Sequence, residues 1–191
     1  MSTERVPCTK CGAMILTATA NKTGGICMPC KNGTRESMEI AKKLREKEKT
    51  DPFILLFESL KNRVIEKGLA SLNEAEGKFY AISVLFSDLY RGAVQLFFEV
   101  NSFDLQKQAK KGLSAIGRDD LIKSLEDAAP LYAQQDEWYA SSDDDEGEPP
   151  HEDTLAKITE DLLQHESDVF ERLELLAVEH ELIEINRLDN H

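Results

Sequence analysis

The sequence of 191 residues contains four cysteines, and they form two Cys-x-x-Cys pairs, Cys8/Cys11 and Cys27/Cys30. Fifteen residues separate the two pairs. Each Cys-x-x-Cys turn directs two thiolates toward one point, and a loop of this length allows the second turn to complete a tetrahedral set of four sulfur ligands. The spacing therefore predicts one Zn²⁺ ion per chain, bound by Cys8, Cys11, Cys27 and Cys30.

The predicted zinc centre is structural rather than catalytic. Four thiolates fill the coordination shell of zinc and leave no position for water or a substrate. Gly12 and Gly33 follow the two pairs, at places where a metal-binding turn needs left-handed backbone. Two alternative roles for the four cysteines are redox chemistry and disulfide formation. Redox chemistry is disfavoured because neither pair is predicted to start a helix after a buried strand, and paired disulfides are uncommon in the cytosol.

Length and hydropathy predict a cytoplasmic protein with one substantial core and one small module. The first residues lack the apolar segment of a secretory signal. The longest apolar run, residues 53–57, is far too short to span a bilayer, so no membrane association is expected.

The net charge of −13 is concentrated in the last third of the chain. Residues 1–49 carry a net charge of +5, residues 50–135 carry −2, and residues 136–191 carry −16. A field of this sign repels nucleic acid and attracts basic protein surfaces. The alternative is an acidic helix that only keeps the protein soluble.

The fold expected is an all-α helical domain of residues 51–191, preceded by a small N-terminal zinc ribbon of residues 1–34 and a charged helical linker of residues 35–50. Apolar residues recur at helical spacing after residue 50, and no alternating strand pattern appears there. Asp51-Pro52 predicts a helix start. Further helices are expected over residues 73–90, 94–100, 103–116 and 119–129, followed by an irregular acidic segment over 133–153 and one long helix from Glu152 to about Leu188.

Motifs for catalysis are missing from the sequence. It has no glycine-rich phosphate loop and no Gly-x-Ser-x-Gly nucleophile elbow. His165 and His180 would lie about 22 Å apart along one helix, too far to share a metal ion. Most carboxylates occupy positions predicted to face solvent, where little tunes their pKa. We therefore expect no enzyme; an enzyme would require a deep pocket with a perturbed carboxylate or histidine.

Acidic and aromatic residues of the last third are the candidates for contacting a partner. Trp138 and Tyr139 follow two acidic residues at the edge of the acidic loop, and such aromatic side chains can anchor a protein partner. A hydrophobic cap on the helical core is the alternative for this pair. The predicted partner-binding residues are Asp136, Glu137, Trp138, Tyr139, Asp143, Asp144, Asp145, Glu146, Glu160, Asp168, Glu171 and Glu174.

The segment Leu72 to Asn101 contains Arg91-Gly92-Ala93-Val94-Gln95-Leu96-Phe97-Phe98 followed by Asn101. With this motif it resembles the DNA-mimic protein family of small acidic bacterial helical proteins, also catalogued as a domain of unknown function. In that family a helix leads into a Gly-Gly-Phe-x-Gln-Phe-Phe-like turn and an asparagine. The resemblance extends over roughly residues 52–185 and implies an all-α fold whose carboxylates replace DNA phosphates in occupying a DNA-binding protein. Arg91 and Val94 depart from the family pattern, whereas the matching residues are Gly92, Gln95, Phe97, Phe98 and Asn101.

The function expected is therefore non-catalytic protein binding. The acidic domain would occupy the basic surface of a nucleic-acid-binding protein, either a DNA-binding regulator or a nuclease toxin, and in the second case the chain would be an immunity protein or antitoxin. The acidic domain itself is not expected to bind nucleic acid. The alternative is a nucleic-acid-binding regulator that uses the zinc ribbon and the basic linker, with the acidic domain in a regulatory role.

Overall fold

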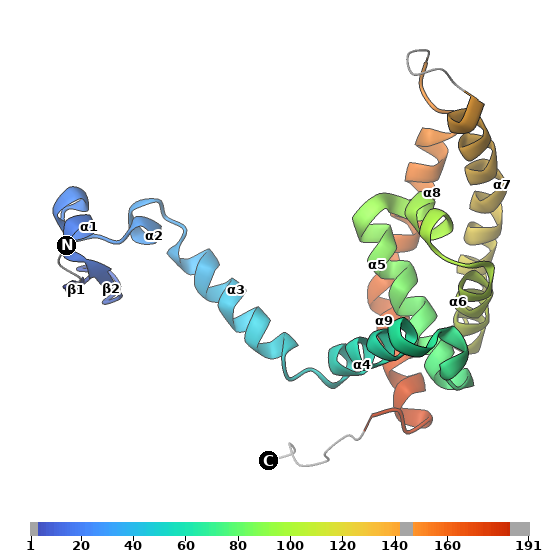
Figure 1. Cartoon of the computed structure of the whole chain (residues 1–191), viewed down its shortest axis with the longest axis horizontal. Coiled ribbons are helices and arrows are strands. Elements are labelled where there is room, and N and C mark those ends of the chain that lie inside the picture. Colours follow the sequence, from blue (N-terminus) through green and yellow to red (C-terminus); the bar gives the residue numbers. More distant parts are fainter. Residues whose placement is uncertain (1–3, 142–146, 184–191) are drawn as a thin grey trace. The chain divides into compact units, whose positions relative to one another are not determined.

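The computed structural model describes residues 4–141 and 147–183 (Figure 1). The chain divides into two compact units, residues 1–54 and 55–191. The second unit is helical and the first contains the four cysteines, which confirms the expected all-α domain preceded by a small ribbon-like module. None of the described helices is both long enough and apolar enough to span a membrane.

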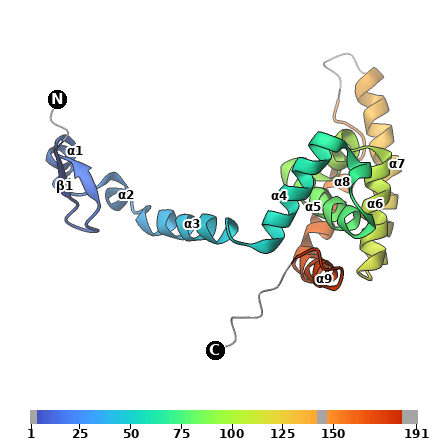
Figure 2. The ribbon, with the colours of Figure 1, turned by 60° about the horizontal axis from the view of Figure 1, so that its bottom comes forward.

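The first unit consists of a short hairpin followed by helices. In the hairpin, Val6 of one strand lies opposite Ile15 of the other, and Gly12 turns the chain between them with φ of 72°. A helix not foreseen from the sequence follows the hairpin, and its first residue, Thr17, donates to the carbonyl of Glu4. The last helix of the unit lies where the sequence predicts a charged helix. The elements are β1 Arg5–Pro7, β2 Met14–Leu16, α1 Thr17–Thr23, α2 Met28–Lys31 and α3 Arg35–Glu48 (Figure 2).

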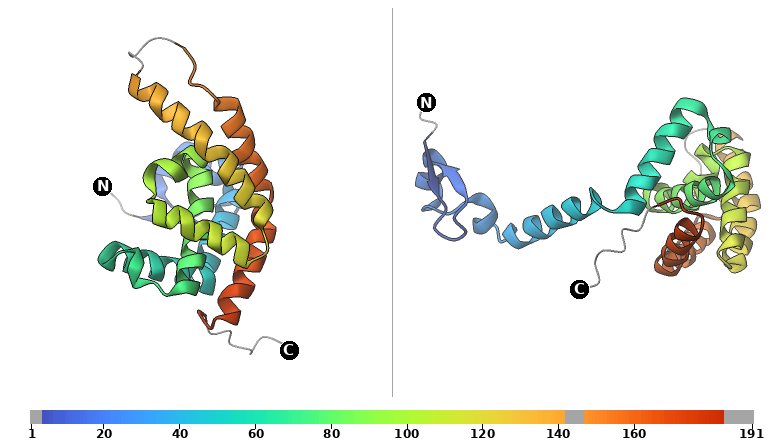
Figure 3. Two further views of the ribbon diagram at one scale, coloured as in Figure 1. Left: turned by 90° about the vertical axis from the view of Figure 1, so that its right-hand side faces the viewer. Right: turned by 90° about the horizontal axis from the view of Figure 1, so that it is seen from below.

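The second unit is built around one long central helix, α5, which packs against α6, α7, α8 and α9 (Figure 3). Its core includes the fully buried side chains of Ile82, Phe86 and Phe97 from α5, and Leu162 and Leu173 from α8 and α9. The elements are α4 Pro52–Lys67, the 3₁₀ turn η1 Leu69–Ser71, α5 Glu74–Val100, α6 Phe103–Ala115, α7 Asp119–Ser141, α8 Glu152–Gln164 and α9 Glu166–Glu179.

The start of α4 and the break in α5 lie where the sequence predicts them. The Asp51 carboxylate accepts hydrogen bonds from the Phe53 and Ile54 amides, at 2.9 and 3.3 Å, as a helix-capping residue does. Within α5 the backbone leaves the helical conformation at Gly92 and at Ala93, whose φ and ψ are 63° and −171°. The helix resumes at Val94, where the Thr159 hydroxyl accepts a hydrogen bond from the Val94 amide at 3.1 Å.

Helix α7 is longer than expected, and the prediction of an irregular chain from residue 133 was wrong as far as Ser141. Pro130 lacks the N–H of a regular helix and costs about 3 kcal/mol in a helix interior. Beyond it, however, the packed face continues, because Gln135 is buried and Tyr132 stacks on Phe98 with ring centroids 5.6 Å apart. This tertiary packing outweighs the local preference of proline.

The single helix expected from Glu152 to Leu188 is two helices, because the chain breaks at His165 and again after Glu179. At the first break the His165 amide donates to Leu162, three residues back, and tightens the last turn. After α9, Glu181 is left-handed with φ of 54°, and the Leu182 amide donates to Ala177, as in a helix-ending Schellman motif. Residues 184–188 of the predicted helix lie outside the described residues.

The close approach of α6 to α5 leads to a testable prediction at Gly112. A Cβ atom at this position would lie 2.9 Å from Ile82 Cδ1 and 3.0 Å from the Lys78 carbonyl oxygen. We expect Gly112→Ala to lower the free energy of unfolding by about 1 kcal/mol, since overpacking outweighs the gain in helix propensity. Urea unfolding followed by circular dichroism measures the change. The exposed Ser114→Ala on the same helix is the control, and a stabilised Gly112→Ala protein would contradict the prediction.

Candidate metal centre and acidic surface

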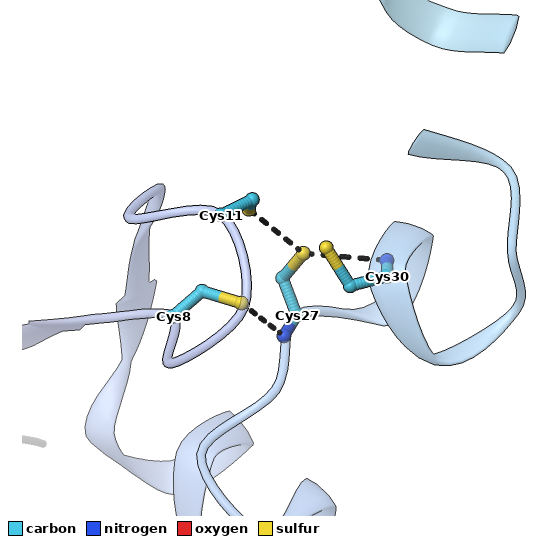
Figure 4. A group of neighbouring side chains, drawn as sticks. All are labelled: Cys8, Cys11, Cys27 and Cys30. Atoms are coloured by element: carbon cyan, nitrogen blue, oxygen red, sulfur yellow. Dashed lines mark hydrogen bonds between the residues drawn. The ribbon is translucent and has the colours of Figure 1, made fainter. Parts of the chain in front are cut away.

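The four cysteines converge on one point in the first unit (Figure 4). Their Sγ atoms all lie within 4.8 Å of one another, and the sulfurs of Cys11 and Cys27 are 3.7 Å apart. A regular tetrahedron with metal–sulfur arms of about 2.3 Å has edges of about 3.8 Å. The residues therefore fit a tetrahedral metal ion with four thiolate ligands. Cys8, Cys27 and Cys30 are buried, and Cys11 is half-buried.

Backbone amides hold the sulfur atoms in place. The Cys27 amide donates to Cys8 Sγ at 3.2 Å, and the Cys30 amide donates to Cys27 Sγ at 3.4 Å. The second pair also begins a helix, since Cys27 is the N-cap of α2. This helix has four residues and follows no strand, so neither pair starts a helix after a buried strand, as the sequence predicts.

The surroundings of the cluster affect two cysteines in opposite directions. The hydrogen bond from the Cys27 amide is the main cause that lowers the pKa of Cys8 to about 6. Burial is the main cause that raises the pKa of Cys30 to about 12. These surroundings favour the thiolate at Cys8 and the protonated thiol at Cys30, so a metal ion has to displace the proton of Cys30 when it binds.

A cation faces the cluster from the start of α3. The negative charge of Cys11 is the main cause that raises the pKa of Arg35. The Arg35 guanidinium also donates to the Glu39 carboxylate at 2.8 Å, which holds it at the cluster. A divalent metal with four thiolates has a net charge of −2, and a neighbouring guanidinium stabilises that charge. This partner was not foreseen from the cysteine spacing.

The predicted partner-binding acids lie on three helices of the second unit. Asp136 and Glu137 are exposed near the end of α7, Glu160 is exposed on α8, and Glu171 and Glu174 are exposed on α9. Four further predicted residues, Asp143, Asp144, Asp145 and Glu146, lie outside the described residues.

The aromatic pair is divided between core and surface. Trp138 is half-buried, whereas 59% of the Tyr139 side chain is exposed. The rings meet edge to face with centroids 5.1 Å apart. Trp138 thus contributes to packing and Tyr139 is the member of the pair that is open to a partner.

Asp168 belongs to an internal ion-pair network. Its carboxylate accepts from Arg118 at 2.5 Å and from Arg172 at 2.9 Å, and the Arg172 guanidinium also donates to the Ile116 carbonyl. Arg118 is almost fully buried and also pairs with Asp120. The network ties α9 to the turn between α6 and α7. Residues so far apart in sequence show no spacing signal that could have revealed it.

A family model described as DMP19-like protein matches residues 70–182, which is more than half of the chain. The chain belongs to the DMP19-like family. No curated protein and no solved structure matches the chain. The match confirms the expected relation to a family of small all-helical domains, and the cysteine cluster of this DMP19-like protein lies before the matched region.

Proposed function

We propose that this DMP19-like protein binds a basic protein through its acidic helical unit and occupies the surface that the partner uses for nucleic acid. Its carboxylates stand in for DNA phosphates, and the chain catalyses no reaction. A DNA-binding regulator and a nuclease toxin both have such a surface, and with a toxin the protein is an immunity protein. The sequence resemblance to DNA-mimic proteins supports this proposal.

The observation that carries the proposal is the charge of α8 and α9. These two helices contain nine acidic residues and two basic ones, Lys157 and Arg172. Arg172 is bound to Asp168 and to a backbone carbonyl, so its charge is partly used inside the molecule. Glu160, Glu171 and Glu174 are exposed. Such a surface favours fast, salt-sensitive association with a basic surface.

We further propose that the cysteine cluster binds one Zn²⁺ ion with a structural role. Four thiolates in a closed tetrahedral set suit zinc, and they leave no position for a substrate. The metal would hold together a small unit whose buried side chains, among the described residues, are Cys8, Ala20, Cys27 and Cys30.

The predicted test of mimicry is competition with DNA. A basic partner captured from host extract and then purified should be displaced from this protein by duplex DNA, and its affinity should fall steeply between low and high salt. The double variant Glu160→Gln, Glu171→Gln should weaken binding about tenfold at low salt, since two charges are removed from the surface.

A matched control removes the same charge elsewhere. Glu66 and Asp127 are exposed on α4 and α7, so Glu66→Gln with Asp127→Asn should leave the affinity within about twofold. Equal losses in both double variants would mean that the acidity acts only through net charge. Tight binding of DNA to the full-length protein itself would instead favour the alternative in which the N-terminal unit binds nucleic acid.

A further inference from the structure

A recess of about 740 Å³ opens in the helical unit where α5 is broken. The broken segment of α5, the second half of α7 and the first residue of α8 line it. Its walls combine aromatic rings with carboxylates, namely Tyr90, Tyr132, Tyr139, Glu99, Asp136 and Glu152. These six residues come from three segments of the sequence, so no local motif marks the recess.

The recess is electrically negative. Among the described residues that line it, Arg91 is the one basic residue, and it pairs with the nearly buried Asp88, outside the lining, at 3.7 Å. Burial, followed by the charges of Asp136 and Glu99, raises the pKa of Tyr132. The first segment of α5 also ends here, and the carbonyl end of a helix favours positive charge. A cation is therefore the ligand that suits this site.

The lining also contains a buried hydrogen-bond acceptor that has no donor among the described residues. Gln95 Oε1 is buried and accepts no hydrogen bond from any described residue. The neighbouring Gln135 has its amide group oriented, because its Nε2 donates to the Pro150 carbonyl at 3.3 Å and to the Glu152 carboxylate at 2.8 Å. A buried acceptor without a partner is unfavourable, and a ligand with several N–H donors would supply the missing hydrogen bond when the Gln95 amide turns toward the recess.

The backbone at the recess is held in an unusual conformation. Ala93 has a positive φ of 63° with extended ψ, a region that residues with a side chain seldom adopt. The buried hydroxyl of Thr159 on α8 fixes the next residue by accepting from the Val94 amide. Both residues of the break, Gly92 and Ala93, belong to the lining of the recess.

We propose that this recess binds one basic side chain of the protein partner, an arginine guanidinium or a lysine ammonium. Tyrosine faces stabilise such a cation through cation–π contact, the carboxylates pair with it, and Gln95 accepts one of its hydrogen bonds. That the bound cation belongs to a partner protein rests on the proposed function. The recess would then supply position-specific recognition in addition to the general attraction of the acidic helices.

The test titrates the full-length ¹⁵N-labelled protein with the peptide acetyl-Gly-Arg-Gly-amide and follows backbone amide signals. We expect saturable shifts at Gly92 and Ala93, and none with the peptide in which neutral citrulline replaces arginine. Asp136→Asn should weaken binding about fivefold, the effect of losing one charged contact in a half-open site. Glu137→Gln is the matched control, because Glu137 is the exposed next residue of α7 and does not line the recess.

Several results would overturn the proposal: equal shifts with citrulline, equal weakening by both variants, or binding of free putrescine at least as tight as that of the arginine peptide. These results do not depend on the natural partner. Failure of DNA to displace a partner would refute the mimicry and leave a positive peptide titration standing. A negative titration would refute the recess and leave the mimicry standing.

Discussion

Cys27→Ser is expected to abolish metal binding and to unfold the N-terminal unit while the helical unit remains folded. Cys27 is central to the cluster because its sulfur lies 3.7 Å from that of Cys11 and its amide donates to Cys8 Sγ. Structural zinc sites contribute about 10–16 kcal/mol of apparent binding free energy in zinc-finger peptides, and such modules unfold without metal. The hairpin and the short α1 and α2 have little other core.

Metal analysis and an amide NMR spectrum measure these two effects separately. The wild-type protein should contain one zinc per chain, and in the variant the signals of residues 5–33 should collapse to the narrow range of an unfolded chain. Signals of α5 to α9 should keep their positions, because that unit has its own core. Met28→Ala, at an exposed position of α2, is the control. Reduced wild-type protein purified without any bound metal would contradict the prediction.

The sequence alone predicted those structural features that are determined by one short segment of the chain. The paired cysteine spacing predicted the cluster, and Gly12 and Gly33 have the left-handed φ of 72° that was expected. The aspartate before Pro52 predicted the start of α4, and Gly92 marked the break in α5. In each case the responsible residues are neighbours in the chain, so the physical cause can be read without knowing the fold.

Features set by distant contacts could not be predicted in this way. Pro130 is a helix breaker by local preference, but the packing of Tyr132 and Gln135 carries α7 past it. The regular apolar spacing through α8 and α9 concealed the break at His165, since Leu162 and Val169 are buried on either side of it. The recess and the ion-pair network likewise join residues that lie 20 to 60 positions apart, such as Tyr132 and Glu152 or Arg118 and Asp168.

The network predicts the second large effect, at Arg118. Arg118→Ala is expected to lower the free energy of unfolding by about 2 kcal/mol at neutral pH. Removing one partner of a buried ion pair costs about 3–5 kcal/mol when the other partner is also buried. Here only 8% of the Arg118 side chain is exposed, but 58% of Asp120 and 46% of Asp168 are, so water partly replaces the lost guanidinium. The buried stem of the arginine adds a packing loss.

At acidic pH, the free energies of unfolding of the wild type and of Arg118→Ala should differ less than at neutral pH. The hydrogen bond from Arg118 is the main cause that lowers the pKa of Asp120 to about 2. A carboxylate whose pKa is lower in the folded state stabilises the protein above its unfolded value of about 3.9, and this contribution is lost as the pH falls toward the folded value. The stability difference should thus be full at pH 6 and smaller near pH 2.5.

Urea unfolding at the two pH values measures this, since urea does not screen ion pairs as guanidinium salts would. Lys123→Ala is the control: it also replaces a basic side chain by alanine, but at an exposed position of α7. That change should cost less than about 0.5 kcal/mol at either pH. An Arg118→Ala protein as stable as the control would show that the network does not hold α9 in place. Asp168 would then again be a candidate for binding the partner, because its charge would not be needed inside the molecule.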